Sequence, residues 1–292
     1  MITSTTRIIQ TANQYVQDFL KEWRKFLKRK DGESLHRMRV VSRRLRVALR
    51  ILEISVPCPS LKKWRRQIRV IGYASGGVRE LDAQKEFLVR LRSNLEAKQY
   101  FSGFESIDSL LKRQKRKRLK KLLRILADRV LYVKIEKLQK RLNKLVDKCD
   151  DFDEFDSSIR ILINGLLDEV LYYERFVTSP RNVTQLHLLR IAIKKLRYAL
   201  ELFSSNKHAF DTHIRAAENV QDVLGDLHEV DVWLAFLPEF AVSVKNNKEK
   251  EKTAEYIMKK CSVSRKRVYK RFIYLWSKLN TKKTWRALRK SL

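Results

Sequence analysis

The strongest constraint on the fold of this chain is an internal repeat. Residues 35–50, LHRMRVVSRRLRVALR, align without gaps on residues 186–201, LHLLRIAIKKLRYALE, and the order of apolar and basic positions is kept. A shorter match follows in the same order, residues 76–82 on residues 225–231. Two copies of one pattern predict two similar folded units in tandem.

The boundary between the two units is predicted from a change in charge. Six acidic residues lie between positions 147 and 156 and interrupt an otherwise basic chain near its midpoint. We therefore predict a first unit over residues 1–150 and a second over residues 151–292. The first unit carries most of the excess positive charge, so we expect it to dominate the binding of anions.

The units are predicted to be helical. Apolar residues recur every three or four positions over residues 8–27, and similar patterns follow along most of the chain. The 7 glycines and 4 prolines are too few for a fold of many strands. We predict an all-α fold of two pseudo-symmetric four-helix bundles. The expected helix breaks lie at Pro57–Pro59, Gly76–Gly77, Ser102–Gly103, Pro180, Pro238 and Asn246–Asn247.

The overall charge points to a polyanionic partner. The chain has 65 Lys and Arg against 33 Asp and Glu, a formal net charge of +32. Self-repulsion of this size destabilises a folded chain, and a polyanion would offset it. The alternative, a charged surface that serves only solubility, usually mixes the two signs.

Each repeated segment has one apolar face and one basic face when drawn as a helix. The basic faces consist of His36, Arg39, Arg43, Arg46 and Arg50 in the first copy, and of His187, Arg190, Lys194 and Arg197 in the second. A merely solvated face would mix in acids for pairing one turn away, and the first stripe has none. Cations three or four residues apart are spaced by about 5 Å, which suits a linear polyanion. In the second copy Glu201 replaces Arg50.

The chemistry of the two histidines has two interpretations. His36 and His187 either donate hydrogen bonds at the ends of the stripes or pack in the core. Surrounding cations disfavour a metal ion, so no metal or organic cofactor is expected. The sequence also contains no Walker-type phosphate loop and no G-x-S-x-G nucleophile motif, so we do not expect an enzyme.

The repeated motifs resemble those of the CHAD (conserved histidine α-helical) domain family. The likeness rests on L-H-x-x-R at residues 35–39 and 186–190, R-E-L-D at 79–82 and L-G-D at 224–226. It implies two helical bundles with a shared basic surface that binds inorganic polyphosphate without chemistry. The binding groove implied by the likeness and the stripes contains His36, Arg39, Arg43, Arg46, Arg50, Arg66, Arg69, His187, Arg190, Lys194 and Arg197. His228-Glu229 departs from the Asn-Asp or Arg-Asp pair common in the family.

Nucleic acid is the alternative partner. Residues 112–121 contain eight bases in ten positions and would bind any phosphate backbone by counterion release. We expect this run to begin the fourth helix, where it either binds phosphate or is a solvated helix end. Aromatic residues such as Trp23, Trp64, Trp233 and Trp276 fall on core positions, which disfavours base stacking. A protein adaptor or granule coat is a third possibility, since an exposed apolar patch would not show in the sequence.

The cellular location is predicted from the cysteines and from the apolar segments. Cys58, Cys149 and Cys261 lie far apart and do not have the C-x-x-C spacing of a zinc or redox site. We therefore interpret them as free thiols in a reducing cytosol. No secretion signal is expected, because polar residues interrupt the first twenty positions. Residues 159–173 are too short and too charged for a membrane span. We predict a cytoplasmic protein associated with polyphosphate granules.

Overall fold

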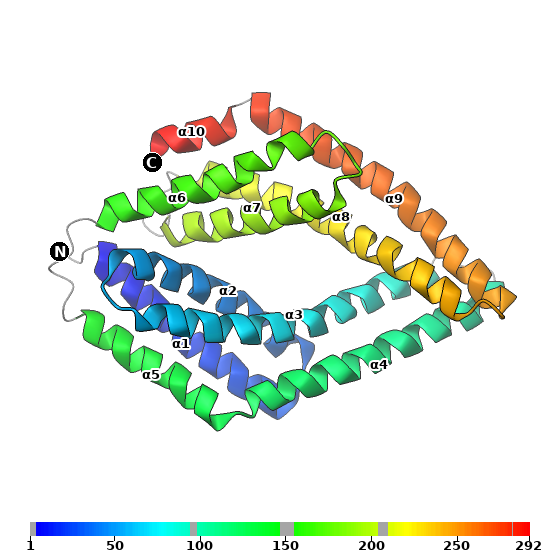
Figure 1. The fold of residues 1–292 in the computed structure, drawn as a ribbon, viewed down its shortest axis with the longest axis horizontal. Coiled ribbons are helices and arrows are strands. Elements are labelled where there is room, and N and C mark those ends of the chain that lie inside the picture. The colour runs from blue at the N-terminus through cyan, green and yellow to red at the C-terminus, as the bar shows by residue number, and fades with distance from the viewer. Residues whose placement is uncertain (1–3, 94–97, 147–154, 204–209, 282) are drawn as a thin grey trace.

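The predicted all-α fold is confirmed. The computed structural model describes residues 4–93, 98–146, 155–203, 210–281 and 283–292. Within these ranges all regular structure is helical, with ten α-helices and no strand. Figure 1 shows the helices as an elongated assembly in which long antiparallel pairs extend toward one end.

The helices run in the same order in the two halves. The first half contains α1 (Ser4–Arg29), α2 (Gly32–Ser55), α3 (Ser60–Ser93), the short 3₁₀ helix η1 (Lys98–Tyr100), α4 (Phe101–Leu126) and α5 (Arg129–Val146). The second contains α6 (Phe155–Tyr172), η3 (Glu174–Phe176), α7 (Val183–Phe203), α8 (Asp211–Ser243), α9 (Lys248–Thr281) and α10 (Thr284–Ser291). Short breaks separate α4 from α5 and α9 from α10, so the fourth helix of each half is in two pieces. The predicted boundary at residue 150 lies outside the described residues.

Three of the predicted helix breaks are wrong. Gly76–Gly77 lies inside α3, Ser102–Gly103 lies in the first turn of α4, and Pro238 lies inside α8. Proline removes one helical hydrogen bond. The helix continues because residues on both sides of it, Leu237 and Phe240, are buried in a hydrophobic cluster, and tertiary packing supplies most helical stability in proteins.

The core consists of two hydrophobic clusters. The larger takes residues from both halves, including the fully buried Trp23 and Leu45 of the first and Leu196 and Phe272 of the second. The smaller lies at the far end of the assembly, where α3 and α4 meet α8 and α9 (Figure 1). Since the main cluster is shared, the halves pack on each other, and α2 contacts α7.

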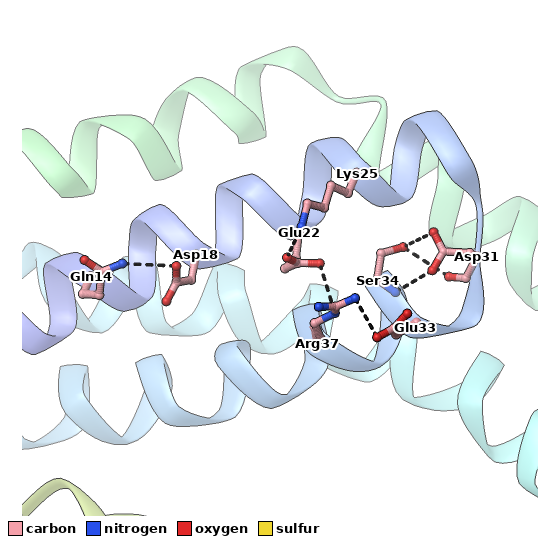
Figure 2. Close-up of polar contacts among 8 residues, drawn as sticks. All are labelled: Gln14, Asp18, Glu22, Lys25, Asp31, Glu33, Ser34 and Arg37. Carbon is pink, nitrogen blue, oxygen red and sulfur yellow. Dashed lines mark hydrogen bonds and ion pairs between the residues drawn. The ribbon is translucent and has the colours of Figure 1, made fainter.

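The start of α2, which carries the first basic stripe, is fixed by polar contacts. Asp31 caps the helix by accepting hydrogen bonds from the Ser34 amide at 2.7 Å and its hydroxyl at 2.8 Å (Figure 2). Arg37 lies between Glu33, at 2.7 Å, and Glu22 of α1, at 3.9 Å. The contact of Arg37 with Glu22 therefore joins the start of α2, where the stripe begins, to α1.

The close contact between α4 and α9 leads to a stability prediction. A Cβ atom at Gly103 would overlap the side chain of Thr253, whose hydroxyl donates to the Glu249 carbonyl at 2.8 Å. Gly103→Ala should therefore destabilise the fold by about 1–3 kcal/mol, as overpacking does. Gly165→Ala is the control, because nothing lies within 4 Å of its Cβ position and alanine should stabilise α6 by about 0.5–1 kcal/mol. Urea denaturation measures both, and a stabilising Gly103→Ala would contradict the packing.

Candidate functional site

The two predicted stripes lie on helices that contact each other. Arg44 of α2 forms an ion pair with Glu201 of α7 at 3.6 Å. The Arg43 guanidinium lies over the ring of Tyr198, 5.6 Å from its centroid, and this ring is only 6% exposed. A cation over a buried aromatic face is held in place by electrostatic attraction and packing. Contacts across α2 and α7 therefore bring the stripe of one half next to the stripe of the other.

Four half-buried cations from the two stripes form what we call the central basic cluster, which consists of Arg39, Arg43, Arg190 and Lys194. Burial, followed by the charges of Arg190, Arg43 and Arg39 in that order, lowers the pKa of Lys194 to about 7. The pKa of Arg39 is lowered to about 10, again by burial first and then by Arg43 and other cations. Charges from both halves therefore share one poorly solvated region.

The central basic cluster has no paired acid within the described part of the chain. None of its four members forms an ion pair there, and Glu80 and Asp222 act on Arg39 and Arg190 only at longer range. The buried Nε atoms of Arg43 and Arg190 also lack a hydrogen-bond acceptor there. Buried donors are costly unless they are satisfied, so the cluster is electrostatically prepared for an anion.

Other predicted site residues differ in their surroundings. Arg197 is held by Glu201 at 3.4 Å and by Glu218 of α8 at 2.8 Å, so its charge is neutralised. Arg50 pairs with Glu53 at 3.7 Å and is exposed. Acids therefore pair with the ends of the two stripes, whereas the cations in the middle of each stripe have no ion pair among the described residues.

The side of the site next to α3 contains three further predicted cations. Arg46 is half-buried and its Nε donates to the Ser42 carbonyl at 3.3 Å. Arg69 is exposed and lies over the Tyr73 ring, 5.3 Å from the centroid. Burial lowers the pKa of Arg46, followed by the charge of Arg43. Arg66 is exposed.

The two predicted histidines have different environments. His36 is exposed on one side, and its partial desolvation, followed by the charges of Arg79, Arg43 and Arg39, lowers its pKa. His187 is half-buried, and its Nδ1 lies 3.1 Å from Nδ1 of His228 on α8. One ring donates and the other accepts. Burial, and then the charge of Arg190, lowers the pKa of both His187 and His228, the latter to about 3.

Three neighbours of the site were not predicted as site residues. Arg79 of α3 lowers the pKa of His36 and Arg39, and it pairs with Glu86 at 2.7 Å. Tyr198 holds Arg43, and His228 contacts His187. Arg79 and His228 occur in the second repeated motif, and Tyr198 in the first, so the repeats contained the signal. Their contacts depend on how helices distant in sequence pack.

Two further features are absent from the described part of the chain. Among the residues that the structure describes, no group of three or more His, Cys, Asp or Glu side chains is arranged to hold a metal ion. None of the described helices combines the length and the apolarity needed to cross a lipid bilayer.

Comparison with known proteins settles the family. The model of the CHAD domain matches residues 10–238, most of the chain. The chain belongs to the CHAD domain family. This confirms the resemblance inferred from the repeated motifs. No curated protein matches this CHAD chain.

Solved structures support the assignment at the level of the fold. The crystal structure of the CHAD domain from the plant Ricinus communis is 19% identical, with a TM-score of 0.66 and coverage of 99% of this chain and 91% of that one. PptA from Streptomyces chartreusis is 13% identical, with a TM-score of 0.74 and coverage of 95% and 100%. At such identities the likeness shows a shared CHAD-type fold.

Proposed function

We propose that this CHAD domain binds inorganic polyphosphate without chemical conversion, through a groove centred on the central basic cluster. The supporting observation is that two stripes distant in sequence meet with no acid paired to Arg39, Arg43, Arg190 or Lys194 among the described residues. Around it we assign weaker contacts to residues on the same or adjoining helices, namely His36, Arg46, Arg50, Arg66, Arg69, His187 and Arg197.

A linear phosphate chain fits this arrangement for electrostatic reasons. Arginines one turn apart along α2 are about 5 Å apart, and guanidinium groups bind phosphate oxygens through two parallel hydrogen bonds. The lowered pKa values of Arg39 and Lys194 mean that these charges are destabilised in the free protein. A phosphate chain would relieve that repulsion and satisfy the buried Nε donors of Arg43 and Arg190.

Nucleic acid remains the second candidate because of the basic run in α4. The sequence predicts that residues 112–121 begin the fourth helix, but they lie well inside α4, which starts at Phe101. Most of them are exposed. They would attract any phosphate backbone. Trp23, Trp233 and Trp276 are buried and offer no surface on which bases could stack, but Trp64 is half-buried and Tyr73 is exposed. Competition between polyphosphate and DNA therefore decides between the two partners.

The location that fits this function is the cytoplasm, in association with polyphosphate granules. A binding protein with this basic surface would concentrate where the polyanion is most abundant. Localisation of a fluorescent fusion alongside a polyphosphate stain tests this part of the proposal.

The dependence of binding on salt tests the proposed function. If the chain neutralises roughly six to ten phosphates, affinity should fall steeply with ionic strength because condensed counterions are released. We expect a slope of about −4 to −7 in a plot of log affinity against log salt, as for single-stranded polyanions. Titration of labelled polyphosphate at several salt concentrations measures it, and a nearly flat plot would exclude binding through the basic stripes.

A further inference from the structure

A second row of cations lies on the outer face of α4, remote from the core. We call it the outer strip, and it consists of Arg113, Arg116, Lys117, Lys120, Lys121 and Arg124. All six side chains are exposed. Their spacing of three or four residues places them on one face, opposite the buried Leu111 and Leu122. The strip extends over about 16 Å of helix.

The outer strip differs from the other cations of the same helix in having no acidic partners. Facing inward, Lys115 pairs with Asp82 at 2.5 Å and Arg118 with Glu80 at 3.1 Å. On the flank, Lys112 pairs with Asp108 at 2.7 Å. Within the described residues, no ion pair involves any member of the strip. Like charges at such spacing destabilise a helix, and an anionic partner would remove this cost.

The outer strip is connected to the central basic cluster through α3. Arg118 donates to the Gly77 carbonyl at 2.9 Å and to Glu80 at 3.1 Å. The charge of Glu80 in turn raises the pKa of Arg39 and of His187. Glu80 therefore contacts Arg118 of α4 directly and acts electrostatically on the cluster, so this acid connects the two basic regions.

The equivalent helix of the second half has a less continuous row of cations. The outer face of α9 carries Lys259, Lys266, Arg267 and Lys270, interrupted by Val263 and Tyr274, which are 64% and 71% exposed. A general requirement for a charged surface would affect both helices alike. The strip is thus a particular feature of the first half, and α9 supplies a matched control.

We infer that the outer strip binds the part of a long polyphosphate chain that extends beyond the central basic cluster. This inference rests on the proposed function and adds a preference for long chains to it. A chain already held in the cluster reaches the strip at high effective concentration, so exposed cations of modest individual strength add to the affinity. A flexible chain can turn around Arg118 onto α4.

Chain length separates this inference from general charge attraction. The strip triple Arg113→Gln, Lys117→Gln, Lys120→Gln is compared with the α9 triple Lys259→Gln, Lys266→Gln, Lys270→Gln, which removes the same charge. Each is titrated with tripolyphosphate, with long-chain polyphosphate and with duplex DNA at low salt, after circular dichroism has shown unchanged helicity. We expect the strip triple to bind the long chain about tenfold more weakly and tripolyphosphate as well as the wild type does. The α9 triple should change neither affinity appreciably.

The other outcomes are distinct. If the strip triple weakens both ligands equally, or no more than the α9 triple, the inference is wrong and the proposed function stands. If it weakens duplex DNA binding but not long polyphosphate, the strip serves nucleic acid and the inference is also wrong. If the wild type binds neither polyphosphate, or a triple replacement in the central basic cluster leaves both affinities unchanged, the proposed function itself fails.

Discussion

Replacement of Arg39, Arg43 and Arg190 by glutamine is expected to weaken polyphosphate binding by about a thousandfold. Each charge-assisted hydrogen bond contributes roughly 1.5–3 kcal/mol, so three together exceed about 4 kcal/mol, and every 1.4 kcal/mol is a factor of about ten. Glutamine keeps a polar, uncharged side chain that is shorter than that of arginine. The loss therefore measures the three charges and their paired donors.

The α9 triple described above is the control for this prediction. Its lysines are exposed, and exposed charges contribute only about 0–1 kcal/mol each. Both triples lower the net charge by three, so long-range attraction is matched. Since the charges of the central basic cluster repel one another, its triple should melt no lower than the wild type, which would exclude unfolding as the cause. Equal losses for the two triples would contradict a localised site.

Polyphosphate affinity is also expected to fall by up to about tenfold per pH unit as the pH rises from 7 to 9. The pKa of Lys194 is lowered to about 7 by burial and by Arg190, Arg43, Arg39 and Arg197. An anion counteracts those charges and raises this pKa, so binding is coupled to proton uptake above pH 7. The same shift stabilises the free folded protein as the pH rises from about 7 toward 10.5, because Lys194 stays protonated only when unfolded.

Lys194→Arg tests whether this lysine causes the pH dependence. Arginine stays charged throughout the range, so the variant should bind with nearly constant affinity from pH 7 to pH 9. The pKa values of His36, His187 and His228 are lowered from 6.5, so these rings are already neutral in this range. Binding curves at constant ionic strength provide the comparison. A slope as steep in the variant as in the wild type would assign the proton to another group.

The sequence predicted the helices and their faces because these depend on local periodicity. Leu45 and Leu196 fall on the apolar faces of their segments and are fully buried in the structure. Arg39 and Lys194 fall on the basic faces and belong to the central basic cluster. The amphipathic pattern requires only that one face meets the core.

Features set by packing between distant helices could not be predicted. The pair of Arg197 with Glu218 joins α7 to α8, and the contact of His187 with His228 does the same. Helix interruption was overpredicted for a related reason. The local backbone effect of Pro238 predicts an interruption, whereas burial of the neighbouring Leu237 and Phe240 decides that the helix continues.

Competition between two polyanions is the most direct test of whether the central basic cluster is specific for polyphosphate. Labelled long-chain polyphosphate is bound to the CHAD domain at physiological salt, and unlabelled polyphosphate or duplex DNA is added at equal phosphate concentration. We predict that polyphosphate displaces the label at a concentration at least tenfold lower than DNA does, because a flexible chain can contact α2 and α7 together. Displacement by DNA at an equal or lower concentration would contradict the proposed function and favour a nucleic-acid partner.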